Sequence, residues 1–440
     1  MTHRTLVEQL YRAAVQSADP RTATRDAVIA LGMTSAPAIL AVGKAARAMC
    51  EGALEGLGAG GLECRFGLIV SETGEPPSVG ALPHLRGDHP VPGQLSYAAA
   101  TALHSALPHA HELGAALVLV SGGTTSLIAQ AVEGVSATDL AFLFDALLRS
   151  GAPITDANVV RRRLLRWGGG RLAVALNPAR VHCLVVSDVM GNDLAAIGSG
   201  PCVGDSSTVA DVRGVLRKYQ LTAPASVDEY LRRVEDGAEP ETPKPHEARL
   251  LSVGARVVLD NSSAVSAVRH AGARLGLERL AVQGPLAGEA SELGAALGSH
   301  LAHAAKSLGR RRLLVSGGEP TVTIAGGADG TGGRCQELAL AAARELHAAG
   351  VEHRVTLLAA GTDGRDGPTD AAGAVVDGFT WARIVAAGRD PAIDLAGHNA
   401  YAALDAAGAL LRSGSTGTNV NDVIIAVVGD EGFGRPVSVG

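Results

Sequence analysis

The sequence is poor in aromatic and charged side chains, which make up 3% and 19% of its 440 residues. Hydrophobic residues reach 47%, and 56 positions are glycine. This apolar content excludes a disordered chain, and the composition is not that of a collagen or a coiled coil. We therefore expect two or three globular domains, at about 150 residues each, with cores built from Leu, Val and Ala.

Paired cysteines, long apolar runs and a basic excess are also absent. The five cysteines (Cys50, Cys64, Cys183, Cys202 and Cys335) include no CxxC pair, which favours free thiols in a reducing compartment. No run of about 18 apolar residues and no signal-peptide pattern occurs, so we expect a soluble cytoplasmic protein. The net charge of −6 disfavours a nucleic-acid partner. We expect a small-molecule partner and no membrane, and the sequence leaves a homodimer open.

Several common active-site signatures are missing as well. The sequence contains no GxxxxGK[ST] P-loop, no GxSxG nucleophile elbow and no HExxH zinc motif. A GxGxxG string is present as Gly56, Gly58 and Gly61, but it follows a helical pattern and not a strand. That context favours a glycine-rich helix end over a dinucleotide site.

Short apolar runs recur along the chain, each ending in Gly, Ser or Asp and followed by a helical pattern. Runs that do not alternate with polar residues are typical of strands buried on both faces, and interleaved helices predict βαβ units in a mainly parallel sheet. In such sheets the ligand site lies beyond the carboxyl ends of the strands. The runs cover residues 38–42, 117–120, 183–186, 313–315 and 355–360.

The pattern also indicates where the chain divides. Amphipathic helices are expected at residues 5–16 and 22–31, and residues 227–247 are charged and carry three closely spaced prolines. We interpret this segment as the end of a helix followed by a surface linker. The sequence therefore predicts two domains, 1–240 and 250–440.

Three features of the first half have the chemistry of a phosphate site. Lys44 lies where a strand passes into a helix and could offer a charge to a phosphate, although a solvent lysine is equally compatible. The hydroxyl-rich glycine turn 121–126 could form a nest for an anionic oxygen, or simply a tight turn. Asp188 and Asp193 follow a strand and could hold Mg²⁺ or accept a hydroxyl proton, although an Asx-turn explains either one alone.

The second half adds three polar segments. The glycine-rich stretch 326–337 leads into a helix with Arg334 at its start, where a guanidinium could clamp a phosphate; a surface loop is the alternative. Residues 361–370 contain three aspartates but do not form an EF-hand, because Ala374 stands where its Glu is needed. Residues 416–422 offer hydroxyls and amides before a strand at 423–428. Together these features suit phosphoryl transfer, which depends on positioning and charge neutralisation.

The ordered motifs resemble those of the class II glycerate kinases, whose C-terminal domain is of the MOFRL type. The matching segments are HPVP at 89–92, SDVMGNDLAAIGSGP at 187–201, SGGEPTVTI at 316–324, GGRCQELAL at 332–340, GTDGRDGPTDAAGA at 361–374 and TGTNVND at 416–422. The resemblance implies a two-domain α/β fold: an N-terminal Rossmann-like α/β/α domain with a mainly parallel sheet, and a smaller C-terminal α/β domain. It also implies ATP- and Mg²⁺-dependent phosphorylation of D-glycerate at its 2-hydroxyl, in a cleft between the domains.

The same resemblance assigns roles to residues of this chain. Lys44 and Arg334 become the cations that stabilise the transferring phosphoryl group and the substrate carboxylate. Asp188 is the third catalytic candidate, and Asp188 with Asp193 forms the candidate metal pair. The remaining candidate substrate- and nucleotide-binding residues are Ser121, Gly122, Gly123, Asn158, Arg161, Arg171, Glu319, Gly332, Gly333, Asp363, Asp366, Asp370, Thr418 and Asn419.

The sequence departs from the family pattern at three places that leave the substrate open. Cys335 stands where the family usually has Asn, Gly168 replaces a frequent Lys, and Thr124-Thr125 stand where Gly-Ser is commoner. The basic cluster nearby, residues 161–163 with Arg166, could gather an anionic substrate or form a solvated helix face. Two other functions stay open: a hydroxypyruvate reductase, which would need a dinucleotide fingerprint, and a sensor that binds a phosphorylated metabolite without turnover.

Overall fold

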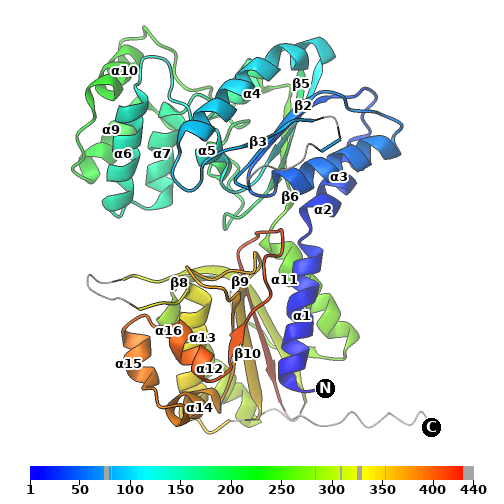
Figure 1. Cartoon of the computed structure of the whole chain (residues 1–440), viewed down its shortest axis with the longest axis vertical. Coiled ribbons are helices and arrows are strands. Elements are labelled where there is room, and N and C mark those ends of the chain that lie inside the picture. Colours follow the sequence, from blue (N-terminus) through cyan, green and yellow to red (C-terminus); the bar gives the residue numbers. More distant parts are fainter. Residues whose placement is uncertain are drawn as a thin grey trace. The chain divides into compact units, whose positions relative to one another are not determined.

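The computed structural model describes residues 1–73, 79–80, 82–282, 284–307, 310–324, 330–351 and 353–429. The chain forms two compact units, each with its own sheet (Figure 1). One, the parallel unit, comprises Pro20–Leu259. The other, the mixed unit, combines Met1–Asp19 with the chain from Asp260 onward.

Among its described residues the parallel unit has six strands, which all run in the same direction, in the order β3-β2-β1-β4-β5-β6. Every residue of β1, β2 and β4 is buried, which agrees with the non-alternating apolar runs. The fold class predicted for this part of the chain is therefore confirmed. The strands are β1 Ala38–Val42, β2 Gly67–Ser71, β3 His84–Arg86, β4 Ala115–Val120, β5 Arg180–Val186 and β6 Val253–Leu259.

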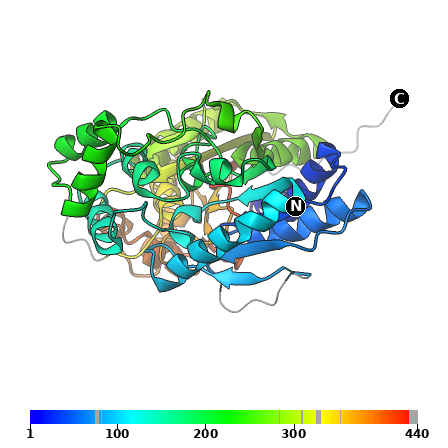
Figure 2. The same cartoon turned by 90° about the horizontal axis from the view of Figure 1, so that it is seen from above.

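Helices cover both faces of this sheet. Leu40 and Val42 of β1 point into one core with α4 and α8, while α3 packs on β1 and β4 and α2 packs on α3 and β6. A second core joins α6, α7, α9 and α10; α9 and α10 are green in Figure 2. The helices are α2 Pro20–Leu31, α3 Ala46–Ala59, α4 Gln94–Leu113, α5 Thr124–Leu127, α6 Ala137–Arg149, α7 Ile154–Leu164, α8 Arg171–Leu176, α9 Val209–Lys218 and α10 Ala225–Glu235, with short 3₁₀ turns η1 Ile197–Ser199 and η2 Ala248–Leu250.

The sheet of the mixed unit has the order β12-β11-β10-β13-β9-β7, with β8 also paired to β9. Neighbours from β9 to β12 are antiparallel, and β7 and β8 run parallel to β9. The strands are β7 Glu278–Arg279, β8 Leu286–Glu289, β9 Arg312–Thr321, β10 Val355–Gly361, β11 Gly373–Asp377, β12 Leu410–Leu411 and β13 Asp422–Val428.

The apolar runs predicted βαβ units in a mainly parallel sheet, and for this half that prediction was wrong, because the strands from β9 to β12 pair antiparallel. Strands β9 and β10 do run in the same direction, because both are antiparallel to β13. However, β13 lies between them, so they do not pair. An apolar run in the sequence predicts a buried strand but does not predict which strand becomes its neighbour.

Strand β9 also extends beyond the predicted end at residue 315 and continues to Thr321. Gly317 and Gly318 lie within this strand and do not form a turn. Because they lack a Cβ atom, neighbouring atoms can approach their backbone closely. A Cβ atom on Gly317 would lie 1.5 Å from Oδ1 of Asn261, and one on Gly318 would lie 2.2 Å from the backbone oxygen of Leu286.

The helices of the mixed unit surround its sheet, and α13 is the most deeply buried of them. Leu338 and Leu346 of α13 pack in one core with Leu301 of α12 and Ile424 of β13. The helices are α1 His3–Ser17, α11 Asn261–Arg274, α12 Ala290–Ser307, α13 Arg334–Ala348, α14 Thr380–Ala386, α15 Pro391–Ala396 and α16 Ala400–Ala406. Among the described residues, no helix is both long and apolar enough to cross a membrane. All five cysteines are buried and free.

The two units differ from the predicted ranges 1–240 and 250–440. Helix α1 packs on α11, β10 and β13 of the mixed unit (Figure 1), while β6 belongs to the first sheet. The segment expected to be a surface linker also folds back, since Thr242 is buried and donates to Asp205 at 3.0 Å. An amphipathic pattern shows that a helix has a buried face, but not which sheet covers it.

Candidate functional site

The parallel sheet has a point where its strand order reverses. From β1 the chain proceeds outward to β2 and β3 and then returns to the other side of β1 as β4. In open parallel sheets, ligands bind beyond the carboxyl ends of the strands at such a point. Here those ends carry Gly43-Lys44 after β1 and Ser121-Gly122-Gly123 after β4.

Hydrogen bonds join these two turns. The backbone N–H of Lys44 donates to the backbone oxygen of Gly122 at 2.9 Å. The buried Ser121 hydroxyl accepts from the N–H of Ala45 at 3.0 Å, at the start of α3. The backbone that carries Lys44 is therefore fixed against the turn predicted to hold an anionic oxygen.

Asp188 reaches the same turn from the neighbouring strand β5. A Cβ atom on Gly122 would lie only 1.9 Å from Oδ2 of Asp188, so the carboxylate lies directly against this glycine. A Cβ atom on Gly123 would lie 3.4 Å from Cγ of Lys44. Lys44, Asp188 and the two glycines thus come together at the ends of three adjacent strands, as a strand-end site requires.

Sequence reasoning missed His89 at this turn. Its Cδ2 lies 3.1 Å from the position of a Cβ on Gly123, and its Nδ1 is 3.1 Å from Oε2 of Glu72. Burial and the nearby Lys44 charge lower the pKa of His89, while Glu72 opposes this shift. The signal that could have identified it is the HPVP segment at 89–92, whose first residue is His89.

The two aspartates of the candidate metal pair have different surroundings. Asp193 is exposed, and its Oδ1 accepts from the N–H of Ala195 at 3.0 Å, which is the Asx-turn alternative. Within the described ranges, no three His, Cys, Asp or Glu residues are grouped so that they could hold a metal ion. Mg²⁺ commonly binds through only one or two carboxylates plus phosphate oxygens and waters, so the donor chemistry of Asp188 is compatible with it.

Arg171 and Asn158 both donate hydrogen bonds to backbone oxygens. The Arg171 guanidinium donates to the backbone oxygens of Arg162 (2.8 Å), Leu165 and Arg163, and to the Tyr230 hydroxyl. These contacts satisfy the carboxyl end of α7. The amide of Asn158, also buried, donates at 3.4 Å to the backbone oxygen of Ala196 in the segment that carries Asp188.

The basic cluster is mostly internal. Arg163 is fully buried and pairs with Glu241, and its Nη2 lies 4.0 Å from Asp205. The Nε of Arg162 lies 3.1 Å from the buried Asp205 carboxylate. Neither alternative from the sequence, a substrate-gathering patch or a solvated face, describes these two arginines.

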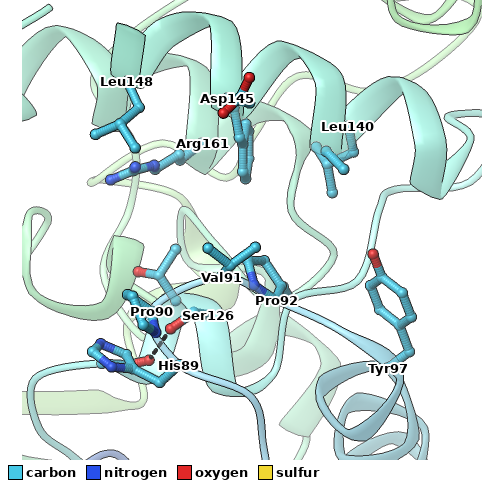
Figure 3. A pocket seen from close by; sticks show the side chains of 15 residues that line it. His89, Pro90, Val91, Pro92, Tyr97, Ser126, Leu140, Asp145, Leu148 and Arg161 are labelled. Atoms are coloured by element: carbon cyan, nitrogen blue, oxygen red, sulfur yellow. Dashed lines mark hydrogen bonds between the residues drawn. The ribbon is translucent and has the colours of Figure 1, made fainter. Parts of the chain in front are cut away.

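Arg161 and Arg166 line two different cavities, and that of Arg161 adjoins the turn after β4. A pocket of about 350 Å³ opens between α6, α7, the HPVP segment and the turn after β4 (Figure 3). The Arg161 guanidinium lies 5.7 Å from the centre of the Phe144 ring, and burial lowers its pKa. Gly123 and His89 line the same pocket, which therefore adjoins the turn at Lys44.

In the mixed unit, Arg334 is held between two carboxylates. Its Nε and Nη2 donate to Asp422 at 2.6 and 3.1 Å, and its Nη1 donates to Glu319 at 2.9 Å. Asp422 begins β13 and pairs in register with Gly318 of β9, which places it beside Glu319. Burial raises the pKa of Asp422, and the Arg334 charge opposes that shift. The predicted Glu319 and Arg334 are therefore in contact, and Asp422 is a member of the cluster that we did not predict.

Asp366 supports this cluster by capping α13. Its oxygens accept from the N–H groups of Cys335 (3.1 Å) and Gln336 (2.8 Å). Burial raises its pKa to about 7, although these two N–H groups oppose the shift. A Cβ atom on Gly333 would lie 2.3 Å from Cγ of Asp366, so Gly333 permits this close approach. Gly332 also approaches the loop that carries Asp366, since a Cβ atom on Gly367 would lie 2.1 Å from the backbone oxygen of Gly332.

The other predicted residues of the mixed unit take part in local contacts. Asp363 accepts from the N–H of Arg365, and Asn419 accepts from the N–H of Asn421. Thr418 is buried, and its hydroxyl makes no hydrogen bond within the described part of the chain. Asp370 is exposed and binds Arg412 and Tyr401, and these partners lower its pKa.

Helix α1 contributes a residue that the sequence did not single out. The buried Tyr11 hydroxyl donates to the backbone oxygen of Gly361 at 2.8 Å, at the end of β10. Burial raises the pKa of Tyr11 to about 12. The amphipathic pattern of residues 5–16 predicted this buried face but gave no sign of its hydrogen-bond partner.

Comparison with known proteins identifies relatives along most of the chain. Residues 6–232 match a family model described as a domain of unknown function, DUF4147, and residues 312–422 match the MOFRL family. A glycerate 2-kinase from Pyrococcus horikoshii is 36% identical over 395 residues, or 89% of this chain and 87% of the relative. A D-glycerate 2-kinase from Thermotoga maritima is 36% identical over 96% of this chain and 98% of its own length.

A relative from Agrobacterium vitis bears a different name, putative hydroxypyruvate reductase, and is 33% identical over 97% of this chain and 94% of its own length. Among solved structures, the crystal structure of a glycerate kinase from Thermotoga maritima matches with a TM-score of 0.85 and 35% identity. That match covers 96% of this chain and 99% of the other.

Proposed function

The chain belongs to the MOFRL-containing family of glycerate kinases, and on this premise we propose that it is a glycerate 2-kinase. It transfers the γ-phosphoryl group of ATP to the 2-hydroxyl of D-glycerate and releases 2-phospho-D-glycerate and ADP. The observation that carries this proposal is the meeting of Lys44 and Asp188 on the glycine turn after β4. A cation and a carboxylate on an open backbone turn at the sheet's reversal point suit a phosphoryl-transfer site.

Each of these groups has a role in the transfer. The Lys44 ammonium stabilises the negative charge that spreads over the transferring phosphoryl oxygens. Gly122 and Gly123 leave the backbone uncovered, so phosphate oxygens can approach it. Asp188 accepts the proton of the attacking hydroxyl or holds Mg²⁺. Magnesium, when bound, neutralises charge on the phosphate oxygens, and Asp188 is the carboxylate we assign to it, with Asp193 as the second predicted ligand.

Arg334 is the predicted cation of the mixed unit. Asp422 and Glu319 hold its guanidinium in place through hydrogen bonds. One guanidinium between two carboxylates leaves this group of three side chains with a net negative charge. We propose that Arg334 contacts the phosphoryl group or the glycerate carboxylate through N–H groups beyond these three bonds. That it serves the same reaction as Lys44 stays a prediction from the family resemblance.

The reductase alternative lacks a supporting observation in the described residues. The GxGxxG string lies in α3 and just after it, whereas a dinucleotide fingerprint connects a strand to a helix. Gly56 has a packing role instead, since a Cβ atom there would lie 2.8 Å from the backbone oxygen of Arg25 on α2.

The decisive experiment incubates the purified protein with ATP, Mg²⁺ and D-glycerate and follows ADP release, with the product identified by phosphorus NMR. We expect a 2-phosphoglycerate signal. A 3-phosphoglycerate signal would retain the kinase and correct the regiochemistry. NADH oxidation with hydroxypyruvate, without ADP release, would replace the proposal by the reductase. ATP or glycerate binding without either reaction would favour the sensor.

Gly122 offers a sharp test of the geometry. In Gly122→Ala, the new Cβ would lie 1.9 Å from Asp188 Oδ2 and would displace this carboxylate. Misplacement by about 1 Å can cost about 100-fold in rate, so we expect a loss of this order in kcat. Gly58→Ala is the matched control, because a Cβ atom there meets nothing within 4 Å. Equal rates for both variants would remove Asp188 from the mechanism.

A further inference from the structure

The pocket beside Arg161 is large for the acceptor substrate. Its volume is about 350 Å³, which lies within the range of about 300–1,000 Å³ typical of pockets that hold drug-sized ligands. Glycerate has three carbons, of which one is the carboxylate carbon and the other two each bear a hydroxyl. A molecule so small and polar would leave most of this pocket unfilled and its apolar walls uncovered.

The walls have the chemistry expected for a flat, partly apolar group. Val91, Pro92, Leu140, Phe144 and Leu148 line the pocket from the HPVP segment and α6 (Figure 3). Aromatic and aliphatic walls bind the faces of a purine ring by stacking and burial. A nucleobase is the part of ATP that requires such walls.

The pocket also leads to the groups proposed to hold phosphate. Gly123 lines it, and a Cβ atom on Gly123 would lie 3.4 Å from Cγ of Lys44. In Figure 3, His89 and Arg161 lie toward one end of the pocket, and Leu140 and Tyr97 lie toward the other. The end with His89 and Arg161 thus carries one guanidinium and adjoins the Lys44 turn, while Leu140 and Tyr97 give the other end an apolar and a phenolic side chain.

We propose that this pocket binds the adenosine of ATP. The polyphosphate extends past His89 and Arg161 toward Lys44, and the base lies against Phe144 and Leu140. This inference rests on the proposed kinase function, because it takes ATP as the donor. It adds the position and orientation of the nucleotide, which that function does not specify.

Two neighbouring phenylalanines on α6 supply a matched pair for the test. Phe144 lines the pocket, whereas Phe142 is 64% exposed and does not line it. In Phe144→Ala we expect the KM for ATP to rise by about tenfold, a typical effect of losing a stacked aromatic ring, with the KM for glycerate within twofold of wild type. Phe142→Ala should leave both constants unchanged.

Ala141→Trp tests the pocket without removing any core contact. Ala141 is exposed and lines the pocket, so the indole would fill the space assigned to adenosine. We expect weaker binding of a fluorescent ATP derivative carrying its label on the ribose, by about tenfold or more, and unchanged competition by inorganic tripolyphosphate.

The outcomes separate this inference from the proposed function. If wild type releases ADP and neither pocket variant changes the KM for ATP, the kinase stands and the adenosine pocket is wrong. If the KM for glycerate rises instead, the pocket belongs to the acceptor. If wild type releases no ADP, the kinase is wrong, and the binding of the fluorescent nucleotide to wild type and Ala141→Trp still decides the pocket.

Discussion

Replacement of Lys44 by alanine should lower kcat by about 10³-fold or more while the protein stays folded. Removing a cation that stabilises the transferring phosphoryl group has effects of this size in other phosphotransferases. The Lys44 side chain is exposed, so its removal leaves no cavity in the core. The measurement is steady-state ADP release, with circular dichroism and thermal unfolding to confirm the fold.

Lys218→Ala provides the control for the loss of one lysine charge. Lys218 is 62% exposed and pairs with Asp156 away from the turns that carry Lys44. This control should keep wild-type kcat. Lys44→Arg should recover only part of the rate, because a guanidinium is planar and its charge lies farther from the backbone. A Lys44→Ala variant with wild-type kcat would remove the site at β1 and β4 from the reaction.

Much of this site could be predicted because strand ends leave a local signature. An apolar run followed at once by Gly-Lys, Ser-Gly-Gly or Ser-Asp places small and charged residues beyond a buried strand. In the parallel sheet, β1, β4 and β5 are adjacent, so the three signatures that precede Lys44, Gly122 and Asp188 meet in space. The order of strands was not visible in the sequence, but their common direction was.

The same local reasoning could not separate a binding residue from a supporting one. Arg171 and Asp366 both lie in glycine-rich segments, yet their polar atoms are used by the ends of α7 and α13. A cap and a ligand contact require the same donors and acceptors. Only the distances to the helix ends distinguish them. His89 was missed for the opposite reason, since its partners Glu72 and Gly123 lie on separate segments.

Arg334→Ala should have two effects that differ in origin. We expect kcat to fall by about 10³-fold, as for Lys44, because a second predicted cation is lost. We also expect unfolding to become easier by roughly 2 kcal/mol. The reason is that the buried Asp422 carboxylate loses its charged partner. The loss is smaller than for a fully buried ion pair, because the Arg334 side chain is 34% exposed. The measurements are ADP release and urea unfolding.

The pH dependence identifies the source of the lost stability. The folded-state pKa of Asp422 lies above its ordinary value of 3.8, because burial disfavours the ionised carboxylate. The free energy of unfolding therefore falls as the pH rises from 3.8 through the folded-state pKa. Arg334 opposes this shift, and its removal raises the pKa further. The stability gap between wild type and Arg334→Ala should therefore be smaller at pH 5 than at pH 8. A gap that does not change with pH would mean that Asp422 is not its cause.

The double variant Arg334→Ala/Asp422→Asn then separates charge neutralisation from phosphoryl transfer. It removes both the cation and the carboxylate that needs it, so stability should return toward that of wild type. If Arg334 contacts the phosphoryl group or the glycerate carboxylate, kcat stays low, because no other group replaces its charge. If kcat recovers together with stability, Arg334 acts only by holding Asp422, and the cation of the reaction is Lys44 alone.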